Sequence, residues 1–184
     1  CFSRDVADFR EAVTQVSGPD IATLTWTVSG YESQLAEAER LIDNAVESIV
    51  CSLWRKEALQ LQPAIERAIA RGVVVTTFSF TRLPEDMGTV LSYGIEEEAL
   101  AAHWTRRVVV VADRAQLLVG EAAGRQLDRA VVSEEMVLVE MAIANLVLDI
   151  TLFSQREGVD VSDTIGQLTQ RLAPIDQLLS ARQG

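Results

Sequence analysis

Residues 106–153 read RRVVVVADRAQLLVGEAAGRQLDRAVVSEEMVLVEMAIANLVLDITLF. The apolar run Val108–Val111 leads to Asp113, a second run ends at Gly120, and a third run covers Ala130–Ser133. Short apolar runs bounded by turn residues predict strands, whereas the long apolar stretch that follows predicts a helix to about Phe153. This segment therefore predicts three strands followed by one long helix.

The preceding part of the chain alternates strand and helix patterns. Three segments have the pattern of strands: LTWTV, residues 48–54 and VVVTTFSF. Residues 31–45 carry a helical apolar face. A second helix is expected to end at Arg71-Gly72, with Pro63 in its first turn, because an interior proline removes a backbone hydrogen bond. We expect an α/β fold with helices on both faces of a mostly parallel layered sheet, because continuous apolar strands suit a covered sheet.

The two ends of the chain are both predicted to be helical. Residues 2–16 have apolar positions at helical spacing, and residues 162–182 form an amphipathic pattern. The C-terminal helix is expected to cover the sheet or to pair with another subunit. The absence of a starting methionine suggests a fragment or a processed form.

Length and composition favour one domain with a substantial core, since the chain has 184 residues and 48% hydrophobic content. The longest apolar stretch, 136–153, is interrupted by Glu140, Asn145 and Asp149, which favours a buried helix or an oligomer interface over a membrane span. No signal peptide is apparent, and neither Cys1 nor Cys51 suggests a disulfide framework. We therefore expect a cytoplasmic protein without a membrane partner.

The charge balance is strongly acidic. Sixteen basic residues against 27 acidic ones give a net charge of −11, and Lys56 is the only lysine. This composition suits a halophilic host, although a GC-rich genome also favours arginine over lysine. Without a basic stripe, the chain by itself is expected to bind DNA poorly.

Residues 106–120 resemble part of a phospholipase D-type half-domain, where HxKxxxxD is followed, seven residues after the Asp, by the Gly of GSxN. Asp113 and Gly120 keep this spacing, whereas Arg106 occupies the His position and Val108 the Lys position. Arginine lacks the free lone pair that a nucleophilic imidazole uses. The only histidine, His103, lies three residues out of register. The resemblance implies a phosphodiesterase fold retained for binding, with no catalytic residue.

Four segments in order resemble the C-terminal effector domain of the TrmB family of transcription regulators. They are LTWTVSGYESQLAEAERLIDNAVESIVCSLW, AIARGVVVTTF, RRVVVVADRAQLLVG and AVVSEEMVLVEMAIANLVLDITLF. The resemblance implies a phospholipase D-like fold, homodimerisation, sensing of a small molecule such as a sugar, and DNA contact through a separate winged-helix domain. The 31 residues after Phe153 are too few for the additional sugar-binding domain of some members.

This resemblance implies three parts. Residues 1–20 form a helix or linker from the absent winged-helix domain, residues 21–158 form the effector-binding domain, and residues 159–184 form a C-terminal helix for packing or dimerisation.

The candidate ligand site lies where the strands end, since ligands of open α/β sheets bind outside the carboxyl ends of the strands. An aromatic ring, an arginine and nearby polar groups there suit a small polar metabolite. The candidate ligand-binding residues are Trp54, Arg55, Ser79, Arg106, Glu121 and Ser133.

Four of these residues also have a structural alternative. Trp54 suits the core, Arg106 and Glu121 suit an ion pair, and Ser133 suits an N-cap of the following helix. No metal or cofactor is expected, because the chain has one histidine, no CxxC and no phosphate-binding loop. The alternative functions are a divergent phosphodiesterase that uses His103 and a ligand-free oligomerisation module.

Overall fold

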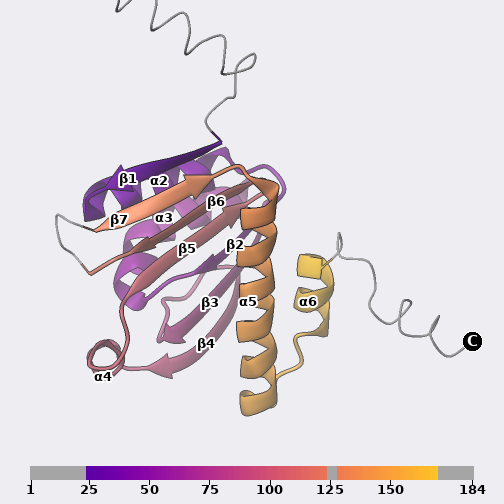
Figure 1. The fold of residues 1–184 in the computed structure, drawn as a ribbon. Coiled ribbons are helices and arrows are strands. Elements are labelled where there is room, and N and C mark those ends of the chain that lie inside the picture. The colour runs from indigo at the N-terminus through magenta and orange to yellow at the C-terminus, as the bar shows by residue number, and fades with distance from the viewer. Residues whose placement is uncertain (1–23, 124–127, 170–184) are drawn as a thin grey trace, which may run out of the picture.

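The computed structural model describes residues 24–123 and 128–169. Seven strands form one sheet in the order β1-β7-β6-β5-β2-β3-β4 (Figure 1). The strands are β1 (Thr25–Ser29), β2 (Ser48–Ser52), β3 (Val74–Thr81), β4 (Thr89–Ile95), β5 (Arg107–Ala112), β6 (Gln116–Glu121) and β7 (Arg129–Ser133). The helices are α2 (Tyr31–Asn44), α3 (Arg55–Ala70), α4 (Glu97–Ala101), α5 (Met136–Glu157) and α6 (Ser162–Thr169).

The sheet is mostly antiparallel, so the expectation of a mostly parallel sheet is wrong. Only β2–β3 and β3–β4 are parallel, whereas β1–β7, β7–β6, β6–β5 and β5–β2 are antiparallel. Three residues separate Ala112 from Gln116 in the β5–β6 connection. A parallel crossover needs about ten or more residues, so this connection can only form a hairpin.

Helices cover the two faces of the sheet, as the sequence predicts (Figure 1). α2 and α3 lie on one face, and α5 lies on the other across β2, β4, β5 and β6. Alternate valines of β5 reach both layers: Val108 and Val110 join the core under α2 and α3, while Val111 joins the core under α5. Burial on both faces explains why these strands have continuous apolar runs, whichever direction their neighbours take.

α3 begins earlier than the sequence predicts, so Pro63 lies inside the helix rather than in its first turn. Two side chains hold the early start: Thr81 Oγ1 accepts a hydrogen bond from the Arg55 N–H at 2.8 Å, and Glu97 Oε2 accepts one from the Lys56 N–H at 3.1 Å. These bonds satisfy backbone donors that a helix N-terminus otherwise leaves to solvent.

α5 is the one described helix that is long and apolar enough to cross a membrane, with a mean hydropathy of 2.0. In the structure it packs on the sheet through Val139, Ile143, Leu146, Ile150 and Phe153. A core helix of a soluble protein meets the same length and hydropathy requirement.

The C-terminal helix is described only in part. α6 begins at Ser162, where Asp160 Oδ1 accepts the backbone N–H of Ser162 at 2.9 Å, and its Leu168 is buried in the core under α5. The remainder of the predicted helix to residue 182 and the predicted helix over 2–16 lie outside the described residues.

Candidate functional site

Three predicted site residues lie at one end of the sheet, and two of them, Trp54 and Arg106, are in contact. The carboxyl ends of β2 and β6 meet the start of β5 there, because both strands are antiparallel to β5. Trp54 follows β2, Arg106 precedes β5, and Glu121 pairs in register with Arg107. The guanidinium carbon of Arg106 lies 5.3 Å from the centroid of the Trp54 ring, within the range of a cation–π contact.

Ser133 lies at the opposite end of the sheet, so its predicted place beside Trp54 is wrong. β7 runs antiparallel to β6, and Ser133 therefore pairs with Leu117 at the beginning of β6. Its hydroxyl lies 2.7 Å from Thr25 Oγ1 and accepts the backbone N–H of Glu135 at 3.1 Å. The strand direction, which the apolar pattern does not encode, decides this position.

Arg106 is held in a cluster of ionisable side chains below the α3 N-terminus. Its Nη2 donates a hydrogen bond to Glu97 Oε1, and its Nε lies 3.8 Å from Glu57 Oε2. The other oxygen of Glu97 accepts the Lys56 N–H. The Glu97 carboxylate therefore bridges the guanidinium and the N-terminus of α3, where a helix dipole favours negative charge.

Glu57 is the most deeply buried acid of this cluster, with no exposed side-chain surface. Its Oε1 accepts a 2.8 Å hydrogen bond from the hydroxyl of Tyr31, while Oε2 lacks a hydrogen-bond partner. Burial raises the pKa of Glu57, although the Tyr31 hydroxyl and the Arg106 charge both act to lower it. Burial and the neighbouring carboxylate raise the pKa of Tyr31 as well.

Arg55 and Ser79 have contacts that serve the fold. Arg55 Nη1 donates to the backbone oxygen of Arg82 at 3.3 Å. Ser79 is fully buried, and its Oγ accepts the Thr81 N–H at 2.9 Å and lies 3.0 Å from Thr81 Oγ1. The Ser79 hydroxyl is therefore already hydrogen-bonded within the end of β3.

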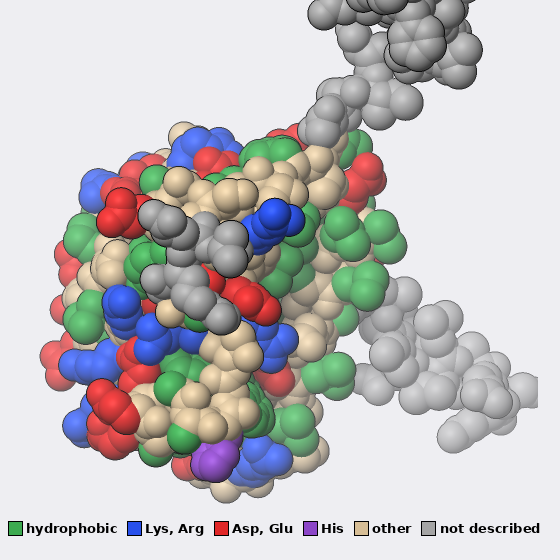
Figure 2. Space-filling model, turned by 60° about the vertical axis from the view of Figure 1, so that its left-hand side comes forward, with side chains coloured by type: hydrophobic (Ala, Val, Ile, Leu, Met, Phe, Trp, Pro, Cys, Tyr) green, Lys and Arg blue, Asp and Glu red, His purple; other side chains and the backbone are tan. Residues whose placement is uncertain are grey.

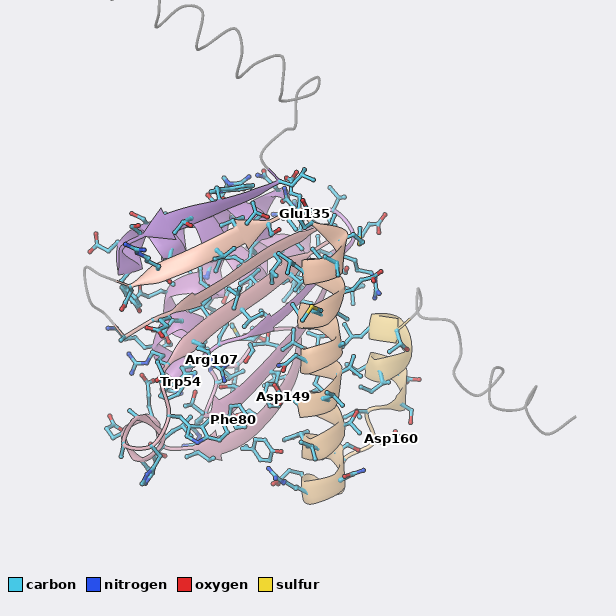
Figure 3. All side chains as sticks on the ribbon, in the orientation of Figure 1. Trp54, Phe80, Arg107, Glu135, Asp149 and Asp160 are labelled. Carbon is cyan, nitrogen blue, oxygen red and sulfur yellow. The ribbon has the colours of Figure 1, made fainter. Side chains whose placement is uncertain are left out.

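A shallow pocket opens on the α5 side of the same end of the sheet. Trp54, Phe80 and Trp104 contribute its aromatic wall, and Arg107 and Asp149 approach from β5 and α5 (Figure 3). Ser52, Thr105, Val109, Asn145 and Leu146 complete the lining. Of this pocket, the sequence prediction includes only Trp54.

The pocket combines stacking surfaces with a charged pair. Trp104 is 49% exposed, and its ring packs edge-on against Phe80 with centroids 4.7 Å apart. Burial raises the pKa of Asp149, while the Arg107 charge and a 3.2 Å hydrogen bond from Asn145 Nδ2 act to lower it. Alternation along β5 is the signal that could have identified Arg107, because Arg106 and Arg107 point to opposite faces.

Three positions of the HxKxxxxD…G spacing have structural roles here: Asp113 and Gly120, which match it, and Val108, which does not. Asp113 Oδ1 accepts backbone N–H groups of the α2–β2 loop, and Val108 is buried in the core. A Cβ added at Gly120 would lie 2.6 Å from the Cβ of Ala130, so the close approach of β6 and β7 requires glycine.

His103 lies on the surface, where it is coloured purple in Figure 2. It lines a pocket together with Trp104 and Arg106. Within residues 24–123 and 128–169, no group of three His, Cys, Asp or Glu side chains is arranged to hold a metal ion. Figure 2 shows acidic and basic side chains interspersed on this face of the molecule.

No protein-family model and no curated protein matches the chain. Among solved structures, the chain resembles TrmBL2, described as an archaeal chromatin protein with a novel mode of DNA binding. The TM-score is 0.53 at 13% identity, and the match covers 84% of this chain and 65% of the TrmBL2 chain. The chain thus spans less than two thirds of TrmBL2, and the likeness establishes a shared fold.

Two further solved structures give weaker matches. NucT from Helicobacter pylori and the phospholipase D family member Nuc from Salmonella typhimurium both have a TM-score of 0.46, at 12% and 16% identity. In each case the match covers 66% of this chain and 91% of the other chain.

Proposed function

We propose that the chain is the effector-binding and dimerisation domain of a cytoplasmic, TrmB-like transcription regulator that senses a small polar metabolite, a sugar or a related compound. In this proposal, DNA is bound by a separate winged-helix domain, and ligand binding changes the geometry of the dimer. The fold shared with TrmBL2 is consistent with this assignment.

The shallow pocket beside α5 carries the proposal. Aromatic rings at Phe80 and Trp104 suit the apolar face of a sugar ring, and Arg107, Asn145 and Asp149 suit its hydroxyls. Asn145 and Asp149 belong to α5, whereas Arg107 belongs to β5. A ligand that bridges these side chains would connect the helix to the sheet.

The charge of the chain supports DNA contact through a separate domain. Its net charge of −11 opposes the phosphate backbone, and a DNA-binding surface needs clustered basic residues. The acidic surface is also the reason that we propose a halophilic host, in which salt screens the repulsion between carboxylates.

We propose that the domain is not an enzyme. The position of the phosphodiesterase nucleophile holds Arg106, and that side chain is engaged by Glu57 and Glu97. Bis(p-nitrophenyl) phosphate should therefore not be hydrolysed above background. Turnover that His103→Ala abolishes would instead support the divergent phosphodiesterase.

The proposal is tested by thermal shift in high-salt buffer with sugars, sugar phosphates and nucleotides. A ligand bound only by the folded state raises the melting temperature by mass action. Arg107→Gln and Asp149→Asn should remove the shift, whereas Arg40→Gln and Asp163→Asn, on exposed helix surfaces elsewhere, should preserve it. A dimer that shifts with none of these compounds would favour the ligand-free oligomerisation module.

A further inference from the structure

α5 has a second apolar face that nothing in the described part of the chain covers. Its buried residues point to the sheet, and an outer stripe on the opposite side contains Val137, Met141, Ala144, Leu148 and Leu152. The exposed fractions are 63% for Val137, 65% for both Met141 and Leu148, and 45% for Leu152. At 100° per residue these five positions lie on the side of the helix opposite the buried set.

The outer stripe is symmetric about its middle. Val137 lies eight positions before Asn145, and Leu152 lies eight positions after Ala144. Met141 lies four positions before Asn145, and Leu148 lies four positions after Ala144. The midpoint of the stripe therefore falls between Ala144 and Asn145. Two antiparallel copies of this helix, related by a two-fold axis through the midpoint, would therefore place Val137 opposite the partner's Leu152 and Met141 opposite the partner's Leu148, with Ala144 opposite the partner's Asn145 at the centre.

The centre of the stripe is suited to close approach. Ala144 is the smallest side chain of the five, and the larger Met141 and Leu148 lie one turn to either side. Small residues at the crossing point let two helices reach the shorter end of the usual 8–10 Å interaxial range.

The charges at the helix ends favour the antiparallel arrangement. Glu134 and Glu135 lie at the N-terminal end of α5, and Arg156 lies in its last turn, next to Glu157, the final residue of the helix. In an antiparallel pair, Arg156 of one helix lies toward the partner's Glu135. The two helix dipoles also point in opposite directions, which is the favourable arrangement for neighbouring helices. A parallel arrangement would instead bring like ends together.

The amount of apolar surface also fits a second copy. The exposed residues of the stripe and its flanks present on the order of 500 Å² of apolar surface, at the upper end of what monomers expose. Two such surfaces together reach the roughly 1,000 Å² expected of a specific interface.

We propose that α5 pairs with the α5 of a second copy of this chain, antiparallel, about a two-fold axis that passes between Ala144 and Asn145. This inference rests on the proposed dimer and identifies its interface. It also explains how the ligand pocket could report to the dimer, because Asn145 lies both beside that axis and in the lining of the pocket.

The first test measures mass by light scattering across a range of concentrations in high-salt buffer. The wild-type chain should be a dimer, and Met141→Glu combined with Leu148→Glu should raise the dissociation constant roughly 100-fold or more, as expected for charges placed in an interface core. The matched control, Val46→Glu combined with Leu59→Glu, changes two exposed apolar residues away from α5 and should remain dimeric.

The possible outcomes distinguish a wrong interface from the absence of a dimer. A stable dimer in the Met141→Glu, Leu148→Glu variant would overturn the α5 interface and leave dimerisation intact. A wild-type chain that is monomeric at every concentration would overturn both, and flotation of that monomer with lipid vesicles would assign the stripe to a membrane surface. Circular dichroism confirms that each variant is folded.

A second test examines the register in a chain whose Cys1 is replaced by serine. Ala144→Cys should form an intermolecular disulfide under mild oxidation, because equivalent Cα atoms close to the axis come within disulfide range. Val137→Cys alone should not crosslink, but a mixture of Val137→Cys and Leu152→Cys chains should. Efficient crosslinking of Val137→Cys with itself would show a parallel pair and overturn the proposed arrangement.

Discussion

The carboxylate of Asp113 accepts a 2.7 Å hydrogen bond from the backbone N–H of Glu47, sixty-six residues earlier in the chain. The same oxygen accepts the N–H of Ser48 at 2.9 Å, and the N–H of Val46 lies 3.0 Å from the second oxygen. One side chain thereby fastens the α2–β2 loop to the turn between β5 and β6, at the end of the sheet opposite the pocket.

Asp113→Ala should lower the free energy of unfolding by roughly 2–3 kcal/mol, because three backbone donors lose a charged acceptor. Asp113→Asn keeps one acceptor oxygen and should lose less. Urea denaturation in high-salt buffer measures both values. Equal stability of wild type and Asp113→Ala would show that these hydrogen bonds contribute nothing to folding.

Gly120→Ala should destabilise the sheet by roughly 1–3 kcal/mol, because the new methyl group meets Ala130 and forces β6 and β7 apart. Gly166 provides the control: it lies in α6 with no atom within 4 Å of an added Cβ. Gly166→Ala should therefore be neutral or stabilising by up to about 1 kcal/mol. Thermal unfolding should give a lower melting temperature for Gly120→Ala and an unchanged or higher one for Gly166→Ala.

Arg106→Met should be destabilising by roughly 3 kcal/mol at neutral pH, because Glu57 keeps a buried charge without its partner. Burial already raises the pKa of Glu57, and loss of the guanidinium removes one influence that lowers it. The folded protein then binds this proton more tightly than the unfolded chain does. The contribution of Glu57 to the stability of the variant is therefore fully present below the ordinary carboxyl pKa and is lost as pH rises through the raised value.

The paired substitution separates charge from packing in this cluster. Glu57→Gln added to Arg106→Met removes the unpaired charge, so it should restore much of the stability at pH 7 and flatten the dependence on pH. Urea denaturation between pH 5 and about pH 8 measures this effect. If the free energy of unfolding of the double variant still depends on pH in the same way, a group other than Glu57 causes that dependence.

Pro63→Ala should stabilise the chain by roughly 1–3 kcal/mol, because Pro63 lies inside α3 and has no N–H to donate within the helix. The replacement restores that donor on an exposed side of the helix. An unchanged or lower melting temperature would indicate that α3 accommodates the proline by a local distortion.

The sequence predicted the local elements well, because helical and strand periodicity depend on neighbouring residues. The apolar faces of residues 31–45 and 136–153 identified α2 and α5, and the runs at Val108–Val111 and Ala130–Ser133 identified β5 and β7. The absence of an imidazole at position 106 could also be read directly from the residue type. The segment 81–105 was least predictable, because Pro84, Gly88 and Gly94 punctuate it and its helix, α4, has only five residues.

By itself, the sequence determined most of the helices and strands, the short length of the loop after Ala112 and the absence of an imidazole at position 106. Only the tertiary structure decided which strands are neighbours, and hence that Ser133 lies far from Trp54 and that Arg106 joins Glu57 and Glu97. It also separated Arg106 from Arg107 onto opposite faces of the sheet. Periodicity is set by adjacent residues, whereas strand order and side-chain partners are chosen by contacts between segments that are distant in the sequence.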